Sequence, residues 1–215
     1  MRIATLSLLA VLLSLALTAP AFASDLYNNG PTNGTSDAYY IDSFIVTDSF
    51  VAFGNMTAFT FSEWVPVGAM PATVSWAVGT TSYGALLGSG TATILPTNVA
   101  PLCSAGSSFN GGTCGGGFPY DVVNSTVVIP AIPLFGNTYW LTLTGATDTL
   151  GGHDAWDINS GPSLAFENLL GAVPSESFTI YDAPSQTTPE PGSIVLFGSG
   201  VLGLARLLRL RLKQV

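Results

Sequence analysis

The sequence predicts an all-β fold, a β-sandwich of jelly-roll type, between Ser24 and Thr188. Short segments rich in aromatic and β-branched residues recur along this stretch, and Gly, Pro, Asn or Asp bounds each of them. Polar and apolar residues alternate in several segments, as in strands with one buried face. No amphipathic helix is indicated, and strands without helices pack as two layers.

The expected strands follow one another along the chain. In TVSWAV, Trp76 faces opposite to Ser75, and in YWLTLTG, Tyr139, Leu141 and Leu143 share one face. About 165 residues suit one domain with a single core, which we place at residues 24–183. The strand segments are AYYIDSFIV, SFVAFGNMTAFTFSEWV, ATVSWAVGT, ALLGSGTATIL, YDVVNSTVVIPAI, NTYWLTLTGAT and SESFTIYD.

Residues 1–23 have the layout of a secretory signal peptide. Arg2 provides the charged start, an apolar run follows, and Ala21 and Ala23 form the small-x-small pattern that predicts cleavage before Ser24. The alternative is a retained anchor, but the run is shorter than the about 20 residues that a bilayer span needs. We expect the mature chain to begin outside the cytoplasm.

Residues 193–215 carry a second membrane signal. The segment is apolar or small as far as Ala205, which predicts a C-terminal membrane-spanning helix. Basic residues after it predict a stop to export and a cytoplasmic end. An ordinary tail anchor is the alternative interpretation. The basic residues are Arg206, Arg209, Arg211 and Lys213.

A linker at residues 184–192 contains Pro189, Glu190 and Pro191, ahead of the Gly-rich apolar segment and the basic cluster. This tail resembles the PEP-CTERM sorting signal of Gram-negative bacteria that make exopolysaccharide, although here the basic residues alternate with Leu. The resemblance implies an exosortase partner that processes the protein near its Pro-Glu-Pro. It also implies anchoring in the inner membrane before processing, then display at the cell surface or in the extracellular matrix. The segments of the body resemble a domain found before such tails, which implies location and architecture but no activity.

The charge of the body restricts its ligands. Of the thirteen acidic residues only Glu190 lies outside residues 24–188, whereas no Lys or Arg lies within that range. Nucleic acid is excluded as a partner because its binding depends on basic side chains. Anionic polymers are disfavoured for the same reason. Neutral ligands, divalent cations or solubility alone remain as explanations.

Cys103 and Cys114 are the only cysteines and flank a Gly-rich stretch. In an oxidising compartment they predict a disulfide. Such a bridge contributes roughly 2–3 kcal/mol by restricting the unfolded chain. No histidine lies near them, so a zinc site is not expected.

The segment TDTLGGHDAWDINSGPS is the densest polar stretch. Asp148, Asp154 and Asp157 offer the oxygen ligands that calcium prefers, although their spacing does not match an EF-hand. A solvated turn is the alternative. No other cofactor is expected.

Trp64 and Trp156, each beside an acidic residue, are the candidates for stacking on a sugar, with core packing as the alternative. Trp76 and Trp140 lie in alternating strands and are expected in the core.

A glycan hydrolase would need two carboxyl groups across one sugar ring. The candidates are Glu63, Asp154, Asp157 and Glu167. A Ser-His-Asp triad is not expected, because His153 is the only histidine and no GxSxG motif occurs. We therefore predict a non-enzymatic surface or matrix protein with a structural, adhesive or carbohydrate-binding body. The alternatives are a secreted hydrolase with paired carboxylates and a coat protein without a ligand.

Overall fold

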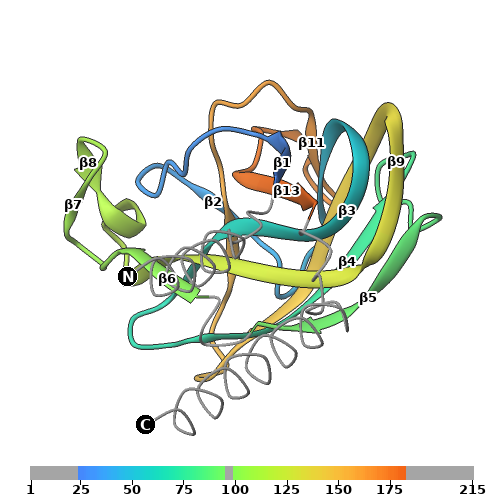
Figure 1. The fold of residues 1–215 in the computed structure, drawn as a ribbon. Coiled ribbons are helices and arrows are strands. Elements are labelled where there is room, and N and C mark those ends of the chain that lie inside the picture. Colours follow the sequence, from blue (N-terminus) through green and yellow to red (C-terminus); the bar gives the residue numbers. More distant parts are fainter. Residues whose placement is uncertain (1–23, 95–98, 183–215) are drawn as a thin grey trace, which may run out of the picture. The chain divides into compact units, whose positions relative to one another are not determined.

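The computed structural model describes residues 24–94 and 99–182, which form one all-β domain (Figure 1). Within these residues there is no α-helix, and no helix is long and apolar enough to cross a bilayer. The predicted signal peptide (1–23), linker (184–192) and C-terminal helix (193–215) lie outside the described residues. The prediction of an all-β body is confirmed.

Residues 24–94 and 99–182 contain thirteen strands and one short 3-10 helix. They are β1 (Ser24–Asn28), β2 (Ala38–Tyr40), β3 (Val46–Pro66), β4 (Pro71–Gly79), β5 (Gly88–Thr93), β6 (Val99–Cys103), β7 (Ser108–Phe109), β8 (Gly112–Thr113), η2 (Cys114–Gly117), β9 (Tyr120–Asp148), β10 (Ala155–Asp157), β11 (Ala165–Glu167), β12 (Gly171–Val173) and β13 (Phe178–Asp182).

The long strands β3 and β9 organise the fold. They pair antiparallel from Val46↔Leu143 to Pro66↔Tyr120. Two bulges interrupt the ladder near its middle, opposite residues 51–53 and 56–58 of β3, and their extra residues lie in β9. Bulges bend a strand and increase its twist, so both strands turn over at this point. Gly54 lies between the bulges with a φ of +133°, a conformation that suits glycine.

Each half of the β3–β9 pair belongs to a different layer. The first half of β3 lies between β11 and the second half of β9, which continues through β4 to the edge strand β5. The second half of β3 lies between the first half of β9 on one side and β13 and β10 on the other, with β6 beyond β9 and β1 beyond β13. The layers are therefore parts of one continuous sheet, and the jelly-roll connectivity stays a prediction.

The hydrophobic core lies between these halves. Phe50 in the first half of β3 meets Phe178 in β13, with ring centroids 6.2 Å apart. Tyr139, Leu141 and Leu143 are all buried, which confirms the predicted alternation. Burying side chains of this size contributes about 1.5–3 kcal/mol each.

Trp76 is buried in the core as predicted, but the expectation for Trp140 is wrong. Trp140 is half-buried, and its ring centroid lies 5.6 Å from that of Phe166 in β11, on the other side of β3. It follows the core residue Tyr139 directly, so the pleat of β9 turns it to the outer face.

The predicted disulfide between Cys103 and Cys114 is present, with an S–S distance of 2.07 Å. It joins the end of β6 to η2 and closes the segment that holds the small β7–β8 hairpin. Cys114 is buried against Trp64 and Val122 in a second, smaller cluster of the core.

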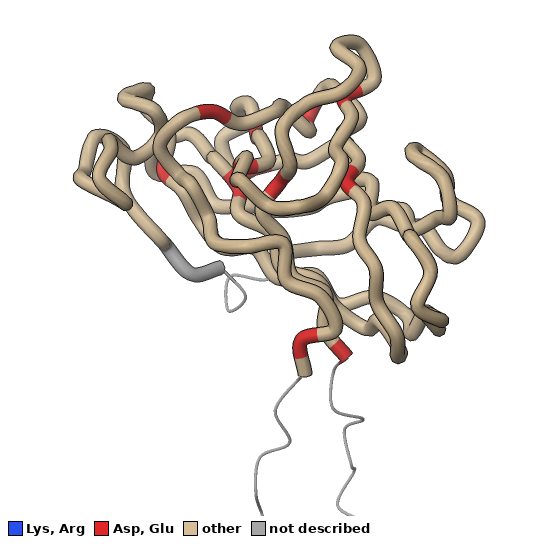
Figure 2. The backbone as a smooth tube through the Cα atoms, turned by 90° about the horizontal axis from the view of Figure 1, so that it is seen from above, with Lys and Arg blue, Asp and Glu red and all other residues tan. Residues whose placement is uncertain are grey.

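The domain has two distinct ends. One end holds the bend of β3 and β9, and we call it the bend end. The first and last described residues of the domain, Ser24 and Asp182, are paired with each other at this end. A Cβ atom at Gly54 would lie 3.8 Å from Asp182, which places the bend beside this exit. The loop end is opposite, where β3 and β9 begin and end. Figure 2 shows acidic positions where the chain leaves the domain and further acidic positions in the opposite part.

Candidate functional site

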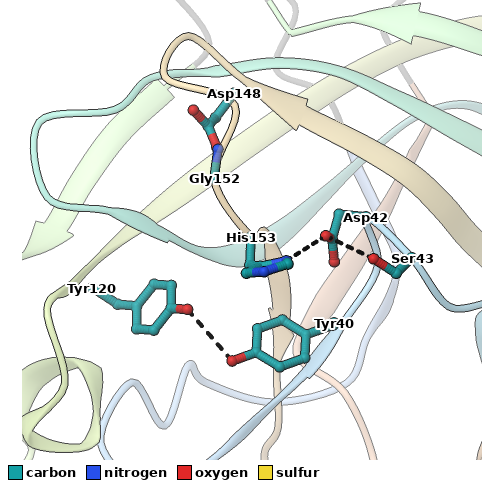
Figure 3. Close-up of polar contacts among 7 residues, drawn as sticks. All are labelled: Tyr40, Asp42, Ser43, Tyr120, Asp148, Gly152 and His153. Atoms are coloured by element: carbon teal, nitrogen blue, oxygen red, sulfur yellow. Dashed lines mark hydrogen bonds and ion pairs between the residues drawn. The ribbon is translucent and has the colours of Figure 1, made fainter.

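The candidate site is a cluster of aromatic and polar side chains at the loop end (Figure 3). Tyr40 ends β2, Tyr120 begins β9, and His153 lies in the loop between β9 and β10. β2 reaches the site because it pairs with β10 in the register Tyr40↔Ala155. Three distant parts of the sequence therefore meet on one surface.

His153 is held by a carboxylate. Its Nδ1 atom lies 2.7 Å from Oδ2 of Asp42, and the hydroxyl of Ser43 donates to the same oxygen at 2.9 Å. The hydrogen bond to Asp42 favours the protonated ring and raises the pKa of His153. The side chain of His153 is 67% exposed. An oriented, solvent-facing imidazole ring is thus available to a ligand, with Nε2 donating when the ring is protonated and accepting when it is neutral.

Two tyrosines complete the surface. The hydroxyls of Tyr40 and Tyr120 lie 3.4 Å apart, and the ring centroids of Tyr40 and His153 are 5.4 Å apart. Burial, followed by the contact with Tyr40, raises the pKa of Tyr120 to about 12, so its hydroxyl stays protonated. Tyr40 is 41% exposed. The cluster offers ring faces and polar tips together, which is the chemistry that amphipathic ligands need.

Asp148, the last residue of β9, orders the loop that carries His153. Its two carboxylate oxygens accept hydrogen bonds from the backbone N–H groups of Leu150 and Gly152. Gly152 also packs closely on Pro66, because a Cβ atom there would lie 2.2 Å from the proline ring. Only glycine fits this approach, so the loop has one tightly defined path.

Behind this surface lie two carboxyl groups that solvent does not reach. Glu63 and Asp154 are both fully buried. Glu63 accepts one hydrogen bond, from Ser125 at 2.7 Å, and burial raises its pKa to about 8. Neither oxygen of Asp154 has a hydrogen-bond partner, and burial, followed by repulsion from Asp148 and Asp42, raises its pKa to about 7.

The carboxylates considered for the alternative, a glycan hydrolase, do not form a reachable pair. Glu63 and Asp154 are sealed, and the oxygens of Asp157 are occupied by other donors. Glu167, in β11, accepts hydrogen bonds from the N–H groups of Leu169 and Leu170. A general acid must reach the glycosidic oxygen, and these groups are enclosed by protein.

The prediction that Trp64 and Trp156 stack on a sugar is wrong. Trp64 is 5% exposed and Trp156 is 0% exposed. The indole N–H of Trp64 donates to Asp157 at 2.7 Å, and that of Trp156 donates to the carbonyl of Ser177 at 2.9 Å. With their polar atoms satisfied internally, both side chains pack in the core.

The predicted calcium ligands are not brought together either. Asp148 and Asp154 influence each other electrostatically, but Asp157 belongs to a separate network. Its carboxylate accepts from the backbone of Asn33 and Gly34 as well as from Trp64. Among residues 24–94 and 99–182, no group of three or more His, Cys, Asp or Glu is placed to hold a metal ion.

A separate hollow of about 340 Å³ lies between the edge strand β5 and the middle of β9. Trp76, Thr91, Val128 and Pro130 contribute to its lining, which contains no ionisable group. It offers hydroxyls and one indole edge but no ordered cluster of ring faces. This hollow is the second candidate for a ligand-binding surface.

Sequence reasoning considered His153 only as a member of a triad and missed Tyr40 and Tyr120. The two tyrosines are 80 residues apart, and no pattern in the sequence links them. The one available signal was the lone histidine in the densest polar loop.

Comparison with known protein families finds a match near the C-terminus. The family model of the PEP-CTERM protein-sorting motif matches residues 187–211, which include the Pro-Glu-Pro and three of the four basic residues. The chain carries a PEP-CTERM sorting motif. The motif directs a protein to export, to processing by exosortase while it is anchored in the membrane, and then to display at the cell surface. No curated protein and no solved structure matches the chain.

Proposed function

We propose that the body of this PEP-CTERM protein is a non-catalytic carbohydrate-binding domain that attaches matrix polysaccharide at its loop end. The cluster of Tyr40, Tyr120 and His153 carries the proposal. Sugar rings present C–H faces that pack on aromatic rings, and hydroxyls that pair with the polar tips of tyrosine and histidine. The cluster supplies both kinds of contact on one exposed surface.

The charge of the domain favours a neutral polysaccharide. No Lys or Arg lies between Ser24 and Thr188 to pair with a uronate or sulfate group. His153 is already engaged by Asp42, so a second anion would compete with that carboxylate. An acidic polymer would also meet the repulsion of the whole domain. An exopolysaccharide of neutral sugars fits these conditions best.

The position of the cluster supports an adhesive role. The chain leaves the domain at Asp182, at the bend end, whereas Tyr40 and Tyr120 lie at the loop end. A polymer bound there does not have to pass the point at which the chain exits. We further propose export by the signal peptide at residues 1–23 and retention in the inner membrane by residues 193–215 until processing, followed by a place in the extracellular matrix.

Catalysis is not part of this proposal. The hydroxyl of Ser43 donates to Asp42 and not to His153, so this serine is not paired with the imidazole as in a Ser-His-Asp triad. The carboxyls of Glu63 and Asp154 are enclosed. These contacts favour binding over hydrolysis.

The proposal is tested by affinity electrophoresis of residues 24–182 through gels that contain the neutral exopolysaccharide of the producing organism. Tyr40→Ala and His153→Ala remove exposed side chains and are expected to abolish the retardation. Tyr120→Phe keeps the ring but removes the hydroxyl, so it is expected to weaken the retardation. Leu169→Ala, at an exposed position in the β11–β12 turn, is the matched control.

The hollow beside β5 provides the competing outcome. Thr91→Arg fills this hollow and should leave retardation unchanged. Retardation lost in Thr91→Arg but kept in Tyr40→Ala would move the site to the hollow. Unretarded wild-type protein, with calcium and with a chelator alike, would refute carbohydrate binding and leave a structural coat protein as the better account.

A further inference from the structure

An aromatic pair projects from the bend end of the domain. Phe53 is 76% exposed and Phe135 is 69% exposed. They occupy paired positions on β3 and β9, so they are cross-strand neighbours on the sheet. Val51, two residues before Phe53, is 53% exposed and adds to the same outer face.

The sheet geometry directs these rings outward. Ala52 precedes Phe53 and Leu134 precedes Phe135, and both of these neighbours are buried. Side chains alternate between the faces of a strand, so the phenylalanines point to solvent. Adjacent exposed aromatic residues form a patch rather than the scattered apolar atoms of an ordinary surface, and such patches mark interaction sites.

The chain itself brings a bilayer close to this patch. Asp182 lies beside Gly54, which directly follows Phe53. Residues 183–192 are the only ones between Asp182 and the apolar segment that begins at Ser193. These ten residues span at most about 36 Å when fully extended. While the sorting segment is anchored for processing, the bend end cannot move far from the membrane.

We propose that Phe53 and Phe135 form a lipid-contact surface that rests in the headgroup region of the bilayer before the protein is processed. Aromatic rings are enriched at this depth, because their apolar bodies leave water there. The contact is apolar and independent of salt, because the described domain has no Lys or Arg and presents Asp25 and Asp182 at this end. Zwitterionic lipid is therefore the preferred surface.

The test uses the full chain in vesicles of phosphatidylcholine. Cys103 and Cys114 are joined in a disulfide, so an introduced cysteine is the only free thiol among the described residues. Asn55→Cys carries a polarity-sensitive fluorophore beside the patch and leaves both phenylalanines in place. Leu169→Cys carries the same label at a comparably exposed position of the loop end. Quenching by nitroxide-labelled lipid is then measured at both positions.

We expect the emission of the fluorophore at position 55 to shift to the blue. We also expect it to be quenched several-fold more than the emission at position 169, with no dependence on salt. Phe53→Ser with Phe135→Ser should reduce the quenching at 55 to the level at 169, whereas Phe53→Trp with Phe135→Trp should retain it. Equal quenching at the two positions, or quenching that survives the serine pair, would overturn the proposal. Quenching by a nitroxide on a second copy instead of on lipid would overturn it in favour of self-association.

Discussion

The two ends of the domain differ in what they bury and in what they expose. The loop end exposes an ordered cluster of tyrosine and histidine and encloses carboxyl groups behind it. The bend end exposes two phenylalanines, and its two acidic residues lie where the chain exits. The difference indicates a division of tasks, with ligand binding at the loop end and contact with the membrane at the bend end.

The buried carboxyls themselves fall into two classes. The donor-rich class includes Asp157, whose oxygens accept from Asn33, Gly34 and Trp64. Asp48 is similar, since it accepts from the N–H groups of Ser49 and Glu176. Burial still raises the pKa of Asp48 and of Asp157, but only to about 6, because the donors stabilise the ionised form.

The donor-poor class is Glu63, Asp154 and Glu176. Asp154 and Glu176 have no hydrogen-bond partner on either oxygen, and one oxygen of Glu63 has none. Burial raises the pKa of Glu176 well above its ordinary value. No Lys or Arg exists in this body to pair with them. Glu63 and Glu176 are therefore mainly protonated at neutral pH, whereas Asp154 titrates close to it, and the fold depends on these protons.

The largest expected effect is the pH dependence of stability. In the unfolded chain these carboxyls ionise near pH 4, whereas folded Asp154 and Glu63 keep their protons up to about pH 7 and 8. The folded state binds more protons in this window, so the free energy of unfolding is highest below pH 4 and falls as pH rises to 8. We expect a loss of several kcal/mol between pH 4 and pH 8 in urea unfolding. A stability that rises across this range would contradict the assignment.

Next in size is the loss of a donor-rich carboxylate. Asp157→Ala leaves the N–H groups of Asn33, Gly34 and Trp64 without their acceptor in a buried site. We expect a loss of about 3–5 kcal/mol at pH 7, measured by urea unfolding. The bend end supplies the control Asp182→Ala, which should change stability by less than about 0.5 kcal/mol. Equal effects at the two positions would remove the distinction between the ends.

A smaller effect of opposite sign is expected for a donor-poor carboxyl. Glu63→Gln replaces an acid that must be protonated with a neutral amide that can still pair with Ser125. We expect stabilisation by about 1–3 kcal/mol at pH 8 and little change at pH 4. Asp157→Asn is the matched amide substitution in the donor-rich class and should destabilise. Destabilisation by Glu63→Gln at pH 8 would show that Glu63 is ionised in the folded state.

The smallest effect is expected at the exposed aromatic pair. Phe53→Ser with Phe135→Ser removes side chains that face solvent, so the free energy of unfolding should change by about 0.5 kcal/mol or less. Urea unfolding of the detergent-solubilised full chain measures it. A loss of several kcal/mol would show that the pair packs against the domain and is not available to lipid.

The sequence allowed the fold class to be predicted better than the site. The alternation of Tyr139, Leu141 and Leu143 with polar residues indicates a strand with one buried face, and all three side chains are buried in the folded domain. The disulfide followed from two cysteines and the compartment. Local pattern made Trp64 a candidate for exposure, but a carboxylate 93 residues away accepts its N–H and allows burial. Contacts of this kind depend on which strands pair, and the pairing cannot be read from the sequence of any single segment.

Binding of neutral polysaccharide to the full chain in vesicles tests the division between the two ends most directly. The dissociation constant is compared between Tyr40→Ala with His153→Ala and Phe53→Ser with Phe135→Ser. The account predicts that the loop-end pair abolishes binding and that the bend-end pair leaves the dissociation constant unchanged. Binding that survives the loop-end substitutions and is lost with the phenylalanines would contradict it.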